Sequence, residues 1–321
     1  MKIVITGVAG FIGSHLAEKA LSEGHDVIGI DCFTDYYPRE YKENNLNCCR
    51  KNRRFRFFPI NIVKEDISSI VKNADVIFHL AAQAGVRSSW GSQFSIYTDF
   101  NILGTQRVLE AARTAGVQRL IYASSSSVYG DVDAFPMSEH VCPRPISPYG
   151  VSKLAGENLC ILYTVNYGLP TVSLRYFTVF GPRQRPDMAF HKFIRSALEN
   201  RPLTIYGDGS QTRDFTFVAD AVDATYNAGI LPGLSGRVLN IGGGSRISLN
   251  KVITIIEDLL GIPLNLQKEG TQKGDVRHTA ADISAAADAL GYEPKISLKD
   301  GLAKEIDWLK SIMDGGLHGN R

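Results

Sequence analysis

Short apolar runs rich in β-branched residues alternate with longer segments of helical periodicity over the first half of the chain. The apolar runs predict β-strands at residues 2–6, 26–30, 55–62, 75–80, 120–124 and 171–175. Between them, apolar residues return every three or four positions, which predicts helices at about residues 12–21, 101–115 and 148–167. This alternation favours an α/β fold, in which a doubly wound parallel sheet carries helices on both faces.

The pattern changes after residue 176, where Gly and Pro divide the chain into shorter elements. We therefore expect a main domain at residues 1–176 and a smaller C-terminal substrate-binding lobe at 177–312. The boundary is not expected to be clean, because the helical pattern at 218–230 and the apolar run at 237–241 look able to return to the main sheet. Residues 313–321 contain three glycines and little apolar content, which predicts a loose tail.

Composition narrows the classes of protein to which this chain can belong. Its 321 residues are 44% hydrophobic and 21% charged, which suits a globular protein with a large core. A net charge of +2 argues against nucleic acid or a membrane surface as a partner, and no apolar run reaches the roughly 18 residues that cross a bilayer. The five cysteines match no metal-ligand spacing, and no charged and apolar leader opens the chain. We expect reduced thiols, no metal site and a cytoplasmic location.

A glycine-rich turn follows the first predicted strand and opens the first predicted helix. Its glycines, Gly7, Gly10 and Gly13, stand three residues apart. The first allows a tight turn, the second lets the backbone approach a pyrophosphate at the helix N-terminus, and the third lets the helix lie close to the strand. Asp31 follows the second predicted strand, where its carboxylate can bind both ribose hydroxyls and would repel a 2′-phosphate. The pattern predicts a Rossmann-type domain that binds NAD.

A tyrosine and a lysine stand four residues apart in the helix predicted at 148–167. This spacing places Tyr149 and Lys153 on one helical face, one turn apart. A cation beside a phenol favours the phenolate and lowers a pKa that is ordinarily about 10, and a hydroxyl of the serine run at 124–127 can relay the proton. Such a device removes a proton from an alcohol while hydride leaves the same carbon, so it needs a nicotinamide cofactor.

These motifs, together with Arg213-Asp214-Phe215, resemble the extended short-chain dehydrogenase/reductase family of nucleotide-sugar enzymes. The resemblance extends from residue 2 to about residue 308. Residues 84–90 and 175–188 are most similar to the UDP-glucuronate 4-epimerase branch of the family. One departure is Asn61, where relatives usually have an aspartate near the adenine; asparagine keeps the capacity for hydrogen bonds.

The resemblance implies an NAD that stays bound and is reduced and reoxidised in each cycle. It makes Tyr149 the base that removes the proton of the sugar 4-hydroxyl, and Ser125 the hydrogen-bond partner of the 4-oxygen. It also implies that Lys153 lowers the pKa of Tyr149 and binds the nicotinamide ribose. The residues that it places on the cofactor are Gly7, Gly10, Phe11, Ile12, Gly13, Asp31, Asn61, Ile62, Leu80, Ala81, Ala82, Asn101, Tyr149, Lys153 and Tyr176. Those that it places on the UDP-sugar are Gly85, Arg87, Ser126, Ser127, Thr178, Arg185, Arg213 and Arg277.

Two serines distinguish between the reactions of this family. Sugar dehydratases carry a pair that resembles Asp-Glu where Ser126 and Ser127 stand, and UDP-glucuronate decarboxylases carry Glu at the second position. Hydroxyl groups have no comparable acid or base strength near pH 7, and epimerisation needs neither. The sequence therefore favours a 4-epimerase, in which C4 is oxidised, the 4-keto sugar turns and hydride returns to the other face.

The sugar is expected to carry a carboxylate at C6, as UDP-glucuronate and UDP-galacturonate do. A buried carboxylate needs charge or several donors to offset its desolvation. Arg213 and Arg277 are expected on the two phosphates, although the arginines can instead be structural charges, paired for example with Asp214 or Asp275. The candidate partners of the carboxylate are Arg87, Ser127, Thr178 and Arg185.

Two other functions stay open, and so does the assembly. A 4-epimerase of UDP-glucose or UDP-N-acetylglucosamine is disfavoured by Arg185 and by Thr178, where such enzymes usually have Asn. A non-catalytic NAD-binding sensor is disfavoured by the intact catalytic set, although fold alone does not give function. Relatives usually pair two helices from each subunit, which implies a homodimer through the helices at 101–115 and 148–167. The leucines that such pairing would bury are Leu154, Leu159 and Leu162.

Overall fold

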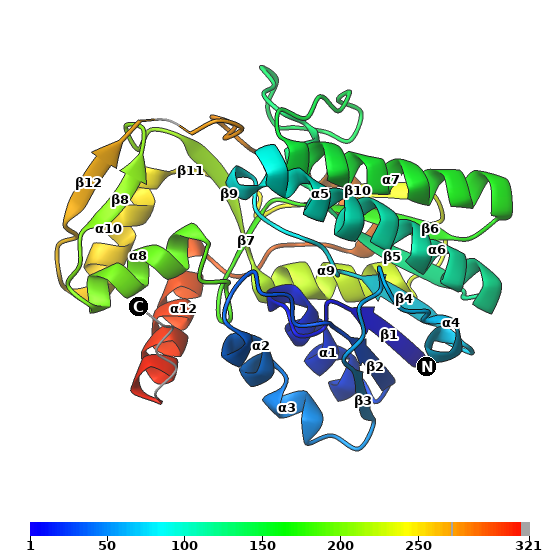
Figure 1. Cartoon of the computed structure of the whole chain (residues 1–321). Coiled ribbons are helices and arrows are strands. Elements are labelled where there is room, and N and C mark those ends of the chain that lie inside the picture. Colours follow the sequence, from blue (N-terminus) through cyan, green and yellow to red (C-terminus); the bar gives the residue numbers. More distant parts are fainter. Residues whose placement is uncertain (271, 316–321) are drawn as a thin grey trace.

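A parallel sheet of seven strands forms the larger part of the molecule (Figure 1). The structure, a computed structural model, describes residues 1–270 and 272–315. The strand order is β10-β6-β5-β4-β1-β2-β3, and every neighbouring pair is parallel. The prediction of a doubly wound α/β fold is confirmed. The strands are β1 (Lys2–Thr6), β2 (Asp26–Ile30), β3 (Phe55–Phe58), β4 (Val76–His79), β5 (Arg119–Ser125), β6 (Thr171–Tyr176) and β10 (Arg237–Ile241).

Both faces of this sheet are covered by helices. Successive strand residues point to opposite faces, so Ile3 packs into one apolar core and Val4 into the other. The helices α1 (Phe11–Ser22) and α9 (Val218–Ile230) cover the first face, and α6 (Gly104–Ala115) and α7 (Pro148–Tyr167) cover the second. Burial on both faces explains why the strands read as continuous apolar runs in the sequence.

The strand order reverses between β1 and β4. From β1 the chain adds β2 and β3 on one side, and β4, β5, β6 and β10 follow on the other. The loops after β1 and β4 therefore leave the sheet in opposite directions and open a crevice at the carboxyl ends of the strands, where doubly wound folds bind their ligands.

Smaller sheets flank the crevice in the second part of the chain (Figure 1, left). One joins β7 (Thr178–Phe180), β9 (Thr212–Phe217) and β11 (Arg246–Ser248), and another joins β8 (Leu203–Tyr206) to β12 (Leu266–Glu269). Although α9 and β10 lie in the second half of the sequence, they pack on the main sheet or extend it. The division at residues 176 and 177 stays a prediction. The helices beside the smaller sheets are α8 (Ala189–Leu198), α10 (Leu249–Leu260) and α12 (Leu298–Asp314).

A few boundaries differ from the sequence prediction. β3 ends at Phe58, because Pro59 has no N–H with which to continue the ladder. α12 takes the first two residues of the expected loose tail, and residues 316–321 of that tail lie outside the described residues. None of the described helices combines the length and apolarity of a membrane span. The remaining elements are α2 (Arg39–Asn45), α3 (Asn47–Arg50), α4 (Ser68–Val71), α5 (Phe94–Tyr97), α11 (Ser284–Leu290), the 3-10 turns η1 (Arg87–Ser89), η2 (Gly91–Gln93) and η4 (Ser126–Val128), and the π-helical η3 (Thr98–Leu103).

Candidate active site

One cavity of about 2320 Å³ occupies the crevice and extends between the main sheet and the smaller sheets. Pockets for a single drug-sized ligand are usually about 300–1,000 Å³, so this one has room for a dinucleotide and a nucleotide sugar together. Of the predicted site residues, all of which are described, Asn61 and Asn101 alone do not line it. Those that do are Gly7, Gly10, Phe11, Ile12, Gly13, Asp31, Ile62, Leu80, Ala81, Ala82, Gly85, Arg87, Ser125, Ser126, Ser127, Tyr149, Lys153, Tyr176, Thr178, Arg185, Arg213 and Arg277.

The glycine turn leaves no room for side chains where β1 passes into α1. Gly7 has a φ of +72°, and a Cβ there would lie 2.6 Å from the backbone nitrogen of Ala81. A Cβ on Gly13 would lie 2.2 Å from the carbonyl oxygen of Gly7. Gly10 is the N-cap of α1, so no side chain stands between the free N–H groups of this helix and the pocket. This cradle fits a pyrophosphate.

Asp31 is held rigidly at the end of β2. Its carboxylate accepts hydrogen bonds from the backbone N–H groups of Ala9 at 3.1 Å and Phe33 at 2.9 Å. Burial nevertheless raises the pKa of Asp31 above its usual value. A fixed acceptor beside the glycine turn fits the two hydroxyls of a ribose, so these residues together suit NAD.

The start of α7 is specified by local sequence. The side chain of Ser147 caps the helix by accepting a hydrogen bond from the N–H of Gly150 at 3.1 Å, and Pro148 takes the first helical position. A Cβ on Gly150 would lie 2.4 Å from the carbonyl oxygen of Ser127, so the helix packs directly against the serine run. This contact brings Tyr149 to the pocket beside the end of β5.

The ammonium of Lys153 is already engaged with the backbone in this structure. It donates to the carbonyl of Ala123 at 2.8 Å and lies 6.0 Å from the ring centroid of Tyr149. Burial raises the pKa of Tyr149, whereas the hydroxyl of Ser125 and then the charge of Arg185 act in the other direction. Burial also lowers the pKa of Lys153 to about 7, although Glu157 opposes this. The sequence expectation neglected the desolvation of both groups.

Hydroxyl groups line the floor of the pocket after β5. The side-chain oxygen of Ser125 accepts a hydrogen bond from the backbone N–H of Ser127 at 3.1 Å, which shapes the short turn η4. Ser126, Ser127 and Thr178, the first residue of β7, lie in the same lining. Positions 126 and 127 therefore offer hydrogen bonds to a ligand but no carboxylate.

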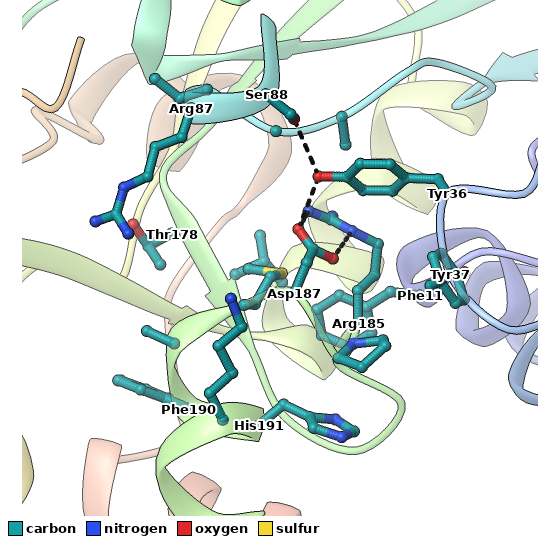
Figure 2. A pocket seen from close by; sticks show the side chains of 18 of the residues that line it. Phe11, Tyr36, Tyr37, Arg87, Ser88, Thr178, Arg185, Asp187, Phe190 and His191 are labelled. Atoms are coloured by element: carbon teal, nitrogen blue, oxygen red, sulfur yellow. Dashed lines mark hydrogen bonds and ion pairs between the residues drawn. The ribbon is translucent and has the colours of Figure 1, made fainter. Parts of the chain in front are cut away.

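Arg185 lines the pocket and forms an ion pair with Asp187. Its Nε and Nη2 donate to the carboxylate of Asp187 at 2.9 Å and 3.0 Å (Figure 2). Although burial opposes the charge, this ion pair raises the pKa of Arg185 above its ordinary value. Asp187 was absent from the predicted site, and its position two residues after the arginine is the only signal in the sequence.

The other arginines are also partly engaged. Arg87 forms a 2.7 Å ion pair with Asp275 and lies 4.1 Å from the ring centroid of Tyr206. The structural pairing that the sequence left open is therefore present for this residue. Arg213 donates from Nη1 to the backbone carbonyl oxygens of Thr212 at 3.0 Å and of Arg277 at 3.1 Å, and burial lowers its pKa.

The two predicted residues outside the lining use their side chains within the protein. Asn61 accepts from the N–H of Val63 at 2.9 Å and so caps its own turn. Asn101 exchanges hydrogen bonds with the backbone of Gln83 and donates to Ser152 at 2.9 Å. Both hold neighbouring segments in place, and their assignment as cofactor contacts stays a prediction.

The hydroxyl of Tyr176 is likewise engaged. It forms a 2.7 Å hydrogen bond with Thr225 of α9, so only the ring of this tyrosine is free to face a ligand.

The parallel sheet, the glycine turn at its switch point and the Ser-Tyr-Lys set define a dinucleotide-binding protein of the short-chain dehydrogenase/reductase class. Within that class, the chain belongs to the NAD dependent epimerase/dehydratase family, whose family model matches residues 3–242.

Individual relatives are similar over nearly the whole chain. An uncharacterised UDP-glucose epimerase of Bacillus subtilis is 48% identical over 98% of this chain and 100% of its own. A UDP-glucuronate 4-epimerase of Thermodesulfobacterium geofontis is 39% identical over 97% of each chain. A crystal structure of UDP-glucuronic acid 4-epimerase from Bacillus cereus, in complex with UDP-glucuronic acid and NAD, is 44% identical with a TM-score of 0.95, over 97% of this chain and 100% of that chain.

Proposed function

We propose that this protein is a UDP-glucuronate 4-epimerase that interconverts UDP-glucuronate and UDP-galacturonate with a bound NAD. The observation that carries the proposal is a single pocket that contains the Ser-Tyr-Lys set, the glycine turn and a group of hydrogen-bond donors that suit a carboxylate. The 44% identical relative of known structure, which binds UDP-glucuronic acid and NAD, supports the same assignment.

The cofactor is held by the glycine turn at its pyrophosphate and by Asp31 at a ribose. When bound, NAD supplies a nicotinamide that accepts the C4 hydride and returns it, so net redox change is zero. Tyr149 removes the proton of the 4-hydroxyl and later gives it back, and Ser125 holds the 4-oxygen by a hydrogen bond. Lys153, when protonated, supplies the positive charge that a buried phenolate needs.

The 4-keto sugar turns about its bond to the pyrophosphate between the two hydride transfers. The volume of about 2320 Å³ supports this step, since the ring must present both faces without leaving the pocket. Arg213 and Arg277 bind the phosphates that stay in place during the turn.

Oxidation at C4 creates a chemical hazard, because the 4-keto sugar is a β-keto acid. When the C5–C6 bond aligns with the ketone π system, that bond breaks, its electron pair forms an enolate at C4 and C5, and CO2 leaves. Arg185 and Thr178 hold the carboxylate away from this alignment. Product analysis of Arg185→Ala and Thr178→Ala tests their role: we expect pentose or 4-keto-pentose products, and an unchanged yield of pure 4-epimer would refute it.

A neutral-sugar epimerase is the second candidate, and two observations favour it. Asp187 already neutralises Arg185, and the 48% identical relative is described as a UDP-glucose epimerase. Incubation of the purified protein with UDP-glucuronate and, in parallel, with UDP-glucose and UDP-N-acetylglucosamine, followed by proton NMR of the anomeric signals, separates the candidates. Conversion of UDP-glucuronate alone supports the proposal, and conversion of only the neutral sugars overturns it.

The protein works as a homodimer through the outer faces of α6 and α7. On α7, Val165 is 76% exposed and Leu162 is 46% exposed, whereas Leu154 and Leu159 pack against the cores of their own subunit. Light scattering of Val165→Glu tests this interface, with Ile262→Glu, 41% exposed on the turn after α10, as the matched control. Only the first change should give monomers.

Its location is the cytoplasm. All five cysteines lie within the described residues, and each is a free thiol.

A further inference from the structure

A tyrosine that the sequence did not single out joins three loops of the pocket. Tyr36 lies between β2 and α2, and its hydroxyl donates to Oδ2 of Asp187 at 3.1 Å. The same hydroxyl lies 3.5 Å from Oγ of Ser88, in the loop after β4. Figure 2 shows Asp187 between Tyr36 and Arg185. The loop that follows the predicted ribose-binding aspartate is thereby connected to the arginine expected to bind the sugar.

The position of this hydroxyl is built into the neighbouring loop. Gly85 has a φ of +103°, and a Cβ there would lie 2.3 Å from Oη of Tyr36 and 2.5 Å from Oγ of Ser88. The Ser88 hydroxyl is itself held by Tyr97 at 2.7 Å. Burial, followed by the charge of Asp187, raises the pKa of Tyr36 to about 12, so its hydroxyl stays a hydrogen-bond donor near neutral pH.

The ion pair with Asp187 decides which edge of the Arg185 guanidinium is free. Asp187 takes the N–H of Nε and one N–H of Nη2, since both nitrogens of Arg185 donate to it. A guanidinium has five N–H donors, so the second fork, made by Nη1 and the other N–H of Nη2, is still available. The two side chains are only 22% and 27% exposed, which limits their freedom to reorient. A carboxylate that binds the second fork must lie in the plane set by the first.

We propose that Tyr36 and Asp187 are positioning residues for the substrate carboxylate, fixing the plane of Arg185 and reserving one of its forks for the C6 group. This inference rests on the proposed function. It adds that Arg185 acts through the direction of its N–H groups more than through net charge, because the Arg185–Asp187 pair is neutral as a whole. An arginine whose guanidinium plane is fixed can keep the C5–C6 bond out of alignment with the neighbouring ketone. A guanidinium that rotates freely would turn with the carboxylate and would not prevent this alignment.

The test uses the NAD-loaded enzyme and three variants. Tyr36→Phe removes only the hydroxyl, and Asp187→Asn removes the charge while keeping the shape. Tyr37→Phe is the matched control, because it removes a hydroxyl from the same loop and no hydrogen bond to that hydroxyl exists among the described residues. For each protein, initial rates at several UDP-glucuronate concentrations give KM and kcat, and NMR gives the ratio of decarboxylated products to 4-epimer.

We expect KM and the decarboxylated fraction to rise on the order of tenfold in Tyr36→Phe and at least as much in Asp187→Asn, the scale of one hydrogen bond to a charged group. Tyr37→Phe should match the wild type. If Asp187→Asn fails to fold, Tyr36→Phe decides alone.

Two kinds of failure can be told apart. A wild-type protein that does not epimerise UDP-glucuronate refutes the proposed function, and the inference falls with it. A wild type that does so, with variants that lose thermal stability but keep KM and product ratio, overturns the inference alone. An equal change in Tyr37→Phe also overturns it, because the effect then belongs to the loop and not to the Tyr36 hydroxyl.

Discussion

Replacing Arg175 with methionine should lower the free energy of unfolding by about 3–5 kcal/mol, the usual cost of breaking a buried ion pair by removing one partner. Arg175, on β6, donates from Nε and Nη2 to Glu157 of α7 at 2.9 Å and 2.8 Å. The two side chains are 5% and 2% exposed. In the variant, Ser124 alone among the present partners would still donate to the carboxylate, which would be left buried without its counter-charge.

The same change should weaken catalysis. Glu157 lies one turn after Lys153 on α7 and raises the lysine pKa, against the larger effect of burial. Arg175 holds the carboxylate of Glu157 through two hydrogen bonds, so its removal disturbs the group that supports the charged form of Lys153. We therefore expect a lower kcat as well as a less stable protein.

Urea unfolding of the wild type, Arg175→Met and the double variant Arg175→Met/Glu157→Met measures the effect. Arg39→Met is the matched control, because the 2.8 Å pair of Arg39 with Glu43 on α2 is 64% and 42% exposed. Such a surface pair contributes about 0–1 kcal/mol. The double variant should regain much of the stability, since no charge is left uncompensated. If Arg175→Met is as mild as the control, or the double variant is no better than the single one, the reasoning is wrong.

Three further predictions concern the turn, the base and pH. Tyr149→Phe should lower kcat about 10²–10⁴-fold in initial-rate assays while the purified protein keeps its NAD; normal turnover would exclude the phenol as base. Gly13→Ala, whose Cβ would lie 2.2 Å from the Gly7 carbonyl oxygen, should cost about 1–3 kcal/mol in thermal or urea unfolding and reduce bound NAD, whereas Gly270→Ala, in open space, should not. Burial raises the pKa of Asp214 to about 6, against an ordinary value of about 3.9, so the folded state holds a proton that the unfolded chain releases between these values. The stability of the wild type relative to Asp214→Asn should therefore fall by about 2 kcal/mol as pH rises from 4 to 7, and a pH-independent difference in urea unfolding would contradict this.

The parts of the fold that follow from local sequence could be predicted. β1 is apolar because both of its faces are covered, and Gly7 and Gly13 stand where no Cβ fits. Pro148 and the serine cap before it fix the start of α7, so the placement of Tyr149 and Lys153 on one helical face follows from the helix alone. These features depend on residues close in the chain, which is why their pattern is visible in the sequence.

The polar partners could not be predicted, because they come from distant segments. Arg87 pairs with Asp275, 188 residues away, and Tyr36 reaches Asp187 across 151 residues. Asn61 accepts a hydrogen bond from the backbone of Val63, a local contact that the side-chain pattern did not indicate. The degree of burial could not be predicted either. Burial raises the pKa of Tyr149, whereas the sequence predicted a lower pKa. A side-chain pattern gives the residue types of a site but not which of them are already engaged.

The position of β10 limits how this enzyme can be recombined with its relatives. All six residues of β6 are buried, and β10 covers its outer edge in a parallel ladder. A chain ending at residue 176 would expose that edge, with a row of unpaired N–H and C=O groups, and would lose α9 from one face of the sheet. Such a fragment should aggregate. A chimaera that exchanges sugar specificity must therefore carry α9 and β10 with the first half and replace only the segments around them.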